Sequence, residues 1–261
     1  MHIAISGIPG SGKSTFGREL TKCLNLTWDS EGNPRRVPYQ YVSGGRMFRE
    51  IASSKNLSVQ QLSELMAESD WMSARVNDSI DSMLRKTCDR CPNLVIDARS
   101  AFALEGKGTV KTLMLCDIER AARRILASER DGEMYASVDT AIRGVEGRIA
   151  FETAEMDDLF GIDPYSPSLC DVAVDPTREL PVTMIASYFA SGIESAEYKG
   201  LTDGREIGKA IYEFCTENNM PAILTPEESS EFDMYDGLNV IYKEERVPRF
   251  APIQRDDDME R

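Results

Sequence analysis

A glycine-rich segment near the start of the chain has the residue types and spacing of a phosphate-binding loop. The segment GIPGSGKST spans residues 7–15 and directly follows the apolar run HIAIS. Glycines at such positions let backbone N–H groups point at a phosphate, and the lysine behind them reaches the outer phosphates. A strand before the segment and a helix after it disfavour the alternative, a chance glycine-rich turn. The residues expected to hold a nucleotide are Gly7, Gly10, Ser11, Gly12, Lys13, Ser14 and Thr15.

A carboxylate after a second buried run is the candidate for binding a metal ion. Asp97 closes the apolar run LVI. In proteins with phosphate-binding loops, a carboxylate at the tip of a neighbouring strand holds Mg²⁺, directly or through water. The alternative is an aspartate that caps the next turn, but the place of the run after a long helix favours the metal. We therefore expect Ser14 and Asp97 to form a Mg²⁺ site.

Arginines close to strand ends are candidates for binding a second phosphate, on an acceptor. The planar guanidinium binds phosphate in bidentate fashion and stabilises charge that develops during transfer. Arg49 follows the second predicted strand by a turn and a half of helix, and Arg99 lies just past the third. Other arginines lie in a later helical stretch, where each is by default a solvated surface charge: Arg124, Arg130, Arg143 and Arg148.

These residues need a scaffold that brings strand ends together. Apolar runs alternate with stretches of helical spacing, which predicts a parallel sheet with helices on both faces. One long helix is expected from Asp70, as its cap, to a break at Pro92, and Ser58 is expected to cap a shorter one. The predicted strands cover residues 2–6, 39–43, 93–100, 110–116 and 170–176.

Composition limits the function further. The 261 residues carry a net charge of −14, a balance that disfavours nucleic acid and anionic membranes as partners. No apolar run approaches the roughly 20 residues needed to span a bilayer, and we expect a cytoplasmic protein. The pair Cys88 and Cys91 lacks the further cysteines or histidines of a metal site, since His2 is the only histidine. Reduced thiols at a helix end are favoured there over a redox pair.

The last quarter of the chain differs in charge from the rest. Residues 195–261 contain sixteen Asp or Glu against eight Lys or Arg. This shift predicts a main domain over residues 1–193 and a small acidic extension over residues 194–261. An accessory subdomain and an element that joins copies of the chain into a homo-oligomer are the two roles open to the extension.

Four segments together resemble the archaeal-type cytidylate kinases of the nucleoside-monophosphate kinase superfamily. They are GIPGSGKST, YVSGGRMFREIASSKNLSVQQL, LVIDAR and FGIDPYSPSLCDVAVDPT, and the resemblance covers about residues 1–190. It implies a P-loop kinase fold with a five-stranded parallel sheet and with helical monophosphate-binding and lid regions. It also implies transfer of the γ-phosphoryl group of ATP, with Mg²⁺, to a small-molecule acceptor, CMP or dCMP.

The resemblance also implies roles for single residues. Arg49 matches the arginine that binds the acceptor phosphate, Arg99 the arginine after the third strand, and Arg148 a lid arginine. Ser43 lies where the family places a small residue beside the nucleoside. The expected substrate-binding residues are thus Ser43, Arg49 and Arg99, and the expected catalytic residues are Lys13, Arg99, Arg124 and Arg148.

Several positions depart from the family pattern. Arg46 stands where an aspartate is usual, Ala98 replaces a glycine, and Glu155 stands where a lid arginine is expected. These changes keep two alternatives open: a nucleotide-binding protein without turnover, and a P-loop kinase for another small molecule. The acceptor base and the oligomeric state are not determined by the sequence.

Overall fold

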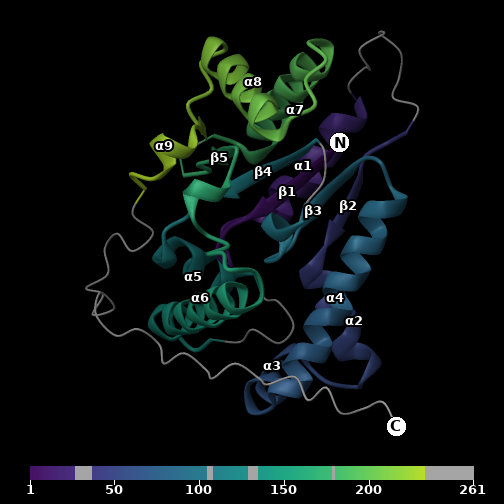
Figure 1. Cartoon of the computed structure of the whole chain (residues 1–261). Helices are drawn as coiled ribbons and strands as arrows, with labels where there is room; N and C mark the ends of the chain where they lie inside the picture. Colours follow the sequence, from purple (N-terminus) through teal and green to yellow (C-terminus); the bar gives the residue numbers. More distant parts are fainter. Residues whose placement is uncertain (27–36, 105–107, 129–134, 178–179, 233–261) are drawn as a thin grey trace.

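A six-stranded sheet runs through the middle of the protein and carries helices on both faces in the computed structural model (Figure 1). The structure describes residues 1–26, 37–104, 108–128, 135–177 and 180–232. The strands lie in the order β2-β3-β1-β4-β5-β6. Their bounds are β1 (His2–Ser6), β2 (Gln40–Ser43), β3 (Leu94–Asp97), β4 (Thr109–Met114), β5 (Val172–Val174) and β6 (Ile223–Leu224).

The parallel part of the sheet agrees with the expected α/β fold, but the sheet has one strand more than the five predicted. Strands β1 to β5 are parallel, whereas β6 pairs antiparallel with β5. The segment around β6 has strand-like composition, yet its two paired residues are too few to reveal an edge position from sequence. Burial of Ala222 and Ile223 in the core explains why the chain returns to the sheet here.

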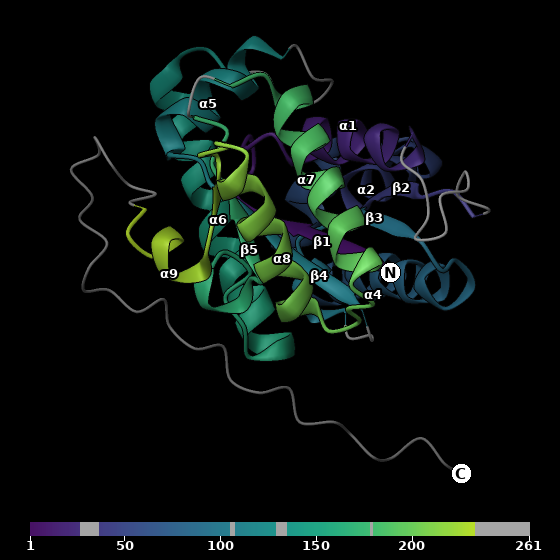
Figure 2. The same ribbon diagram turned by 90° about the horizontal axis from the view of Figure 1, so that it is seen from above.

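Each face of the sheet is covered by its own layer of helices. One face packs against α1 (Lys13–Leu26), α7 (Val182–Tyr198) and α8 (Gly204–Glu217), with Phe16 and Phe189 in edge-to-face contact. Figure 2 shows α7 and α8 lying across the strands. The opposite face packs against α4 (Asp70–Arg90), which α2 (Gly44–Ser54) and α3 (Val59–Glu68) adjoin.

Two further helices form a separate pair below the sheet in Figure 1. They are α5 (Ile118–Ala127) and α6 (Val138–Phe160), which share a small apolar core with Ile8 and Tyr165. The pair follows β4, so its residues begin where the sheet presents its carboxyl edge. Short 3₁₀ turns at Ala101–Ala103 and Pro167–Leu169 and the one-turn α9 (Pro226–Ser229) complete the described elements.

Helix caps were predicted in one case correctly and in another off by a residue. Ser58 caps α3 in a reciprocal capping box with Gln61. For α4 the cap is Ser69, whose hydroxyl accepts the N–H of Met72, so the expectation that Asp70 is the cap was wrong. Asp70 is instead the first helical residue. Neighbouring Ser and Asp are both good caps, which makes this position ambiguous from sequence.

The division at residue 193 stays a prediction. Helix α7 runs across that position to Tyr198, and α8 packs against α7 and the sheet. The segment LNVIYKEE at residues 238–245, whose composition predicts a strand, and the acidic tail lie outside the described residues. In the described ranges, no helix has the length and apolar character needed to cross a membrane.

Candidate functional site

The glycine-rich loop connects the carboxyl end of β1 to the first turn of α1. Gly7 has φ +142°, and a Cβ there would lie 2.6 Å from the Met114 carbonyl oxygen at the end of β4. Gly10 has φ +85°, and its Cβ would lie 2.6 Å from the Ala121 carbonyl oxygen of α5. Only glycine suits such backbone conformation and close approach. The loop is therefore pressed between two elements, which fixes its path.

Side chains around the loop hold its carbonyl groups. The Lys13 ammonium donates to the carbonyl oxygens of Gly7 and Ile8, the latter at 2.9 Å. Arg124 of α5 donates from Nη1 to the Ser11 carbonyl oxygen at 3.0 Å. Both cations thus lie at the loop. The structure therefore brings together Lys13 and Arg124, which the sequence analysis named as candidate catalytic residues. The hydroxyl of Ser11 is buried without a hydrogen-bond partner, while Thr15 is exposed in the first turn of α1.

The expected metal residues meet at the ends of α1 and β3. Ser14 Oγ donates to Asp97 Oδ2 at 2.6 Å, and the Asp97 carboxylate is almost completely buried. Hydroxyl and carboxylate oxygens at the start of a phosphate-binding helix are hard donors of the kind that Mg²⁺ takes, together with water and phosphate oxygens. The donor set therefore fits Mg²⁺, and Ser14 and Asp97 are the residues that would hold it.

Tyr41 of β2 completes this group, and the sequence did not single it out. Its hydroxyl donates to the same Asp97 Oδ2 at 2.7 Å. Burial, and then the nearby Asp97 charge, raise the pKa of Tyr41 to about 12, so the donor proton is retained. Gly17 of α1 makes room for the ring, because a Cβ there would lie 2.8 Å from Tyr41 Cε2. A tyrosine two residues before a strand end was the only available signal.

The predicted acceptor residues begin where β2 enters α2. Ser43 is opposite Asp97 in the register of β2 and β3, and its hydroxyl caps α2 by accepting the Arg46 N–H at 3.3 Å. Arg49 folds back over this first turn, since a Cβ at Gly45 would lie 3.6 Å from Arg49 Nη1. Within the part of the chain that the structure describes, no ion pair is formed by Arg49.

Arg99, by contrast, is occupied by a carboxylate of α6. Its Nη1 forms an ion pair with Glu155 Oε2, and the two side chains are only 21% and 15% exposed. The other oxygen, Glu155 Oε1, accepts the Asn77 amide and, at 3.4 Å, the Ser73 hydroxyl, both on α4. Burial raises the pKa of Glu155, and the Arg99 guanidinium opposes that rise. Glu155 thus joins the end of β3 to α4 and α6.

A second pair on α6 lies one turn away. Arg148 Nη2 is 3.4 Å from Glu152 Oε1, and Glu152 Oε2 accepts the hydroxyl of buried Tyr165. Burial, together with the Glu152 charge, raises the pKa of Tyr165 well above its usual value. The segment that carries Tyr165 is anchored to the end of β1, just before the loop, because Ser6 Oγ donates to the Pro164 carbonyl oxygen at 2.5 Å. The segment FGIDPY, residues 160–165, therefore links α6 to the end of the strand that leads into the phosphate-binding loop.

Arg46, which stands where the resembling family usually has an aspartate, pairs with a residue of its own helix. Its Nε lies 2.8 Å from Glu50 Oε1 in an exposed pair one helical turn apart. Exposed pairs of this kind contribute little to stability. The new positive charge beside the acceptor residues is thus balanced locally by a neighbour on α2.

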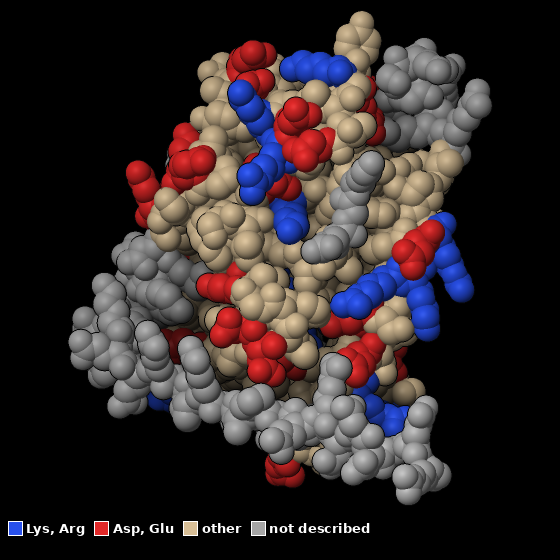
Figure 3. Space-filling model, in the orientation of Figure 1, with Lys and Arg blue, Asp and Glu red and all other residues tan. Residues whose placement is uncertain are grey.

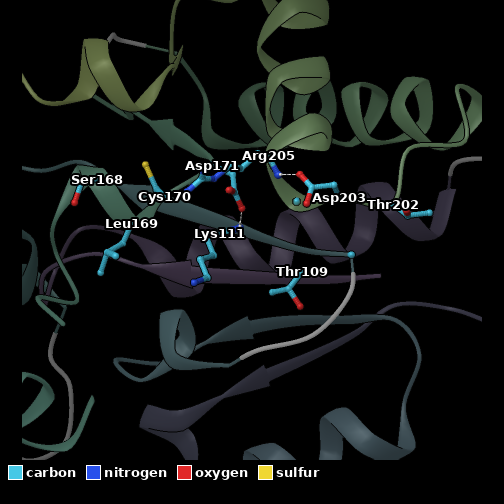
Figure 4. A pocket seen from close by; sticks show the side chains of 11 residues that line it. Thr109, Lys111, Ser168, Leu169, Cys170, Asp171, Thr202, Asp203 and Arg205 are labelled. Atoms are coloured by element: carbon cyan, nitrogen blue, oxygen red, sulfur yellow. Dashed lines mark hydrogen bonds between the residues drawn. The ribbon is translucent and has the colours of Figure 1, made fainter. Parts of the chain in front are cut away.

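Another hollow of the molecule lies away from this chemistry. A cavity of about 600 Å³ is bounded by the starts of β4 and β5 and the first turn of α8 (Figure 4). Lys111 and Asp171 line it, with the Lys111 N–H donating to Asp171 Oδ2 at 2.8 Å. The phosphate-binding loop follows the opposite ends of the strands, so none of the site residues above reaches this cavity.

Surface charges of both signs mix on one face of the molecule (Figure 3), and the cysteines are free thiols. On the face in Figure 3, basic side chains lie among acidic ones on the helices. Cys88 and Cys91 are free thiols at the end of α4. Over the described ranges, no group of three or more histidine, cysteine or acidic residues could hold a metal ion.

Comparison with known protein families finds a match over the part of the chain that contains the glycine-rich loop. A family model described as "AAA domain" matches residues 3–143, more than half of the chain. The chain belongs to this AAA domain family. The matched range includes the glycine-rich loop, Asp97, Arg99 and Arg124, but ends inside α6 before Glu155.

Curated relatives confirm the resemblance seen in the sequence. A cytidylate kinase of Haloarcula marismortui is 28% identical over 74% of this chain and 94% of its own length. A cytidylate kinase of Halobacterium salinarum is also 28% identical, over 68% of this chain and 82% of its own. Among solved structures, TT1252 from Thermus thermophilus has 18% identity and a TM-score of 0.38, covering 57% of this chain and 79% of that one.

Proposed function

We propose that the protein transfers the γ-phosphoryl group of MgATP to a nucleoside monophosphate, most specifically CMP or dCMP. The observation that carries the proposal is the meeting of two kinds of group at one edge of the sheet. The glycine loop is surrounded by Lys13, Ser14 and Asp97. Arg49 follows strand β2, and Arg99 follows its neighbour in the sheet, β3. The similarity to cytidylate kinases supports the choice of acceptor.

Phosphoryl transfer asks the protein mainly for alignment and charge stabilisation. Lys13 and the loop N–H groups would grip the β- and γ-phosphates of ATP, while Arg124 fixes the loop from α5. Mg²⁺, when bound at Ser14 and Asp97, supplies charge neutralisation of the donor phosphates. The acceptor phosphate is already anionic, so no general base is assigned.

On the acceptor side, Arg49 would bind the monophosphate from α2 and Arg99 from the end of β3. Ser43 would lie beside the nucleoside. Arg148 and its neighbours on α6 would cover the reacting phosphates, because water that reached them would divert ATP to hydrolysis. In this scheme α2 and α6 approach the same phosphates from opposite sides.

A second function is favoured by one observation. Both Arg99 and Arg148 are paired with glutamates of α6. If those pairs persist with nucleotide bound, the protein binds ATP without transferring phosphate. This alternative is a nucleotide-binding protein in which α6 covers the bound nucleotide but supplies no residue for phosphoryl transfer.

The deciding experiment is an ADP-release assay with MgATP and a panel of CMP, dCMP, UMP, AMP, GMP, glycerol or buffer alone. We expect turnover with CMP or dCMP well above the buffer rate. Equal, slow ADP release with all acceptors, combined with tight ATP binding by calorimetry, would select the non-catalytic alternative. Turnover with glycerol but no nucleotide would select a kinase for another small molecule.

A further inference from the structure

The charged groups around Arg99 are balanced without any ligand. Arg99 and Arg148 are matched by Glu155 and Glu152 on the same helix, α6. Glu152 also lies close enough to add to the rise in the pKa of Glu155. A cluster with equal numbers of cations and carboxylates has no excess positive charge to offer to a phosphate.

Glu155 takes up the binding capacity of Arg99 and is itself held in place by further contacts. One of its oxygens takes the Arg99 guanidinium, and the other takes Asn77 and Ser73. Both members of the ion pair are mostly buried, so water screens their attraction weakly. A phosphate group that binds Arg99 must therefore replace a carboxylate that is already held by three side chains.

Resting on the proposed function, we infer that Glu155 is an internal competitor for the acceptor phosphate, which must displace it from Arg99. The expected displacing group is a phosphate monoester dianion, whose second negative charge and extra oxygens favour it over a single carboxylate at a bidentate arginine. Glu155 then discriminates against acceptors without such a phosphate, because those leave the Arg99–Glu155 pair in place.

Displacement also links the acceptor to the position of α6. Glu155 connects α6 to Asn77 and Ser73 of α4 and to the end of β3. When the carboxylate leaves Arg99, α6, which also carries Arg148, loses its ion-pair connection to the end of β3. A ligand shifts such an equilibrium by its differential affinity for the two arrangements.

The test compares Glu155→Gln with Asp158→Asn, which removes the same charge from an exposed position one turn further along α6. The glutamine keeps the size and the acceptor oxygen for Asn77 but loses the charge that holds Arg99. We expect the KM for the nucleoside monophosphate to fall about threefold to tenfold in Glu155→Gln, as for loss of a competing partly buried charge. The KM for ATP and both constants in Asp158→Asn should stay as in the wild type.

A rise or no change in the acceptor KM of Glu155→Gln would overturn the inference, because a merely positioning or structural glutamate predicts those results. Glu155→Asp provides a second variant should glutamine disturb folding. Its shorter side chain keeps the charge but withdraws it from Arg99, so the acceptor KM should again fall. An unchanged or higher value would count equally against the competitor role.

Failure of the proposed function gives a different result from failure of this inference. If the wild type transfers phosphate to no acceptor, binding of inorganic phosphate by calorimetry replaces the kinetic readout. Tighter phosphate binding by Glu155→Gln than by the wild type, lost again on adding Arg99→Ala, would support the competitor role. Equal binding by the wild type and Glu155→Gln would reject it.

Discussion

The donor and acceptor sides of the candidate site are built in different ways. On the donor side, consecutive residues form a loop whose path is fixed by glycines pressed against β4 and α5. On the acceptor side, Arg99 after β3, Asn77 of α4 and Glu155 of α6 meet, and the charges of Arg99 and Glu155 pair with each other. The backbone path of the donor loop is thus fixed before any phosphate binds, whereas Arg99 on the acceptor side is held by Glu155.

Removal of the loop lysine should have the largest effect and tests the donor side. Lys13→Ala removes the only ammonium within the loop motif, and with it direct charge stabilisation of the transferring phosphoryl group. We expect kcat to fall about 10³-fold or more, as for loss of a central transition-state contact. Turnover near the wild-type rate, with an unchanged melting temperature, would disprove the assignment of the loop.

Arg99→Ala tests the acceptor side. The acceptor KM should rise about tenfold to a hundredfold, as expected when a charge-assisted contact to phosphate is lost. The KM for ATP should change little. Arg205→Ala, an exposed arginine on α8 at the other edge of the sheet, is the matched control. Equal losses for both substrates would remove Arg99 from the acceptor side.

Donor-side packing can be tested with alanine at two glycines. Gly10→Ala places a Cβ against the Ala121 carbonyl and requires an unfavourable positive φ, so the free energy of unfolding should fall by about 1–3 kcal/mol. Gly147→Ala on α6 meets open space and should raise stability by about 0.5–1 kcal/mol. Urea unfolding of both variants measures the contrast; equal changes would show that the loop is not confined by α5.

Tyr41→Phe sharpens the comparison at the metal. Without the hydroxyl, Asp97 loses a donor that fixes its orientation. The free Mg²⁺ concentration for half-maximal activity should rise about tenfold, as for loss of a partner behind a metal ligand. The acceptor KM should not change. A magnesium titration with unchanged midpoint would show that Tyr41 has only a packing role.

The smallest expected effect concerns pH. Burial raises the pKa of Glu155 above its ordinary value of 4.5 in the folded protein, so the folded state binds this proton more tightly than the unfolded chain. Its contribution to stability is complete below pH 4.5 and is lost as pH rises through the raised pKa. Glu155→Gln should therefore gain stability relative to the wild type as the pH rises above 4.5. Thermal unfolding of both proteins at several pH values measures this. A difference in melting temperature that stays constant as the pH rises above 4.5 would contradict the prediction.

The two sides also differ in how far the sequence predicts them. Local pattern was enough for the parallel strands, the loop and the contact of Ser14 with Asp97, because each depends on neighbours in sequence or on strand ends that must align. It did not predict the Arg99–Glu155 pair. That pair depends on where α6 lies relative to β3, a packing relation between residues 56 positions apart.

The role of Tyr41 and the pairing of β6 with β5 were missed for related reasons, although the segment PAILT at residues 221–225 has strand-like composition. The role of Tyr41 requires that α1 leave space at Gly17, which no single segment shows. The two-residue strand β6 gains its place from burial beside β5 rather than from its own pattern. In both cases the deciding term is tertiary packing, which overrides local propensity.

The close fit of Gly17 and Tyr41 limits how this protein can diverge. A larger residue at position 17 would meet the Tyr41 ring at 2.8 Å, on a helix surface distant in sequence from β2. The ring would have to be replaced at the same time, and its hydroxyl on Asp97 would be lost with it. Related chains should therefore change these two positions in concert, so that covariation between them would trace a metal-orienting contact through evolutionary time.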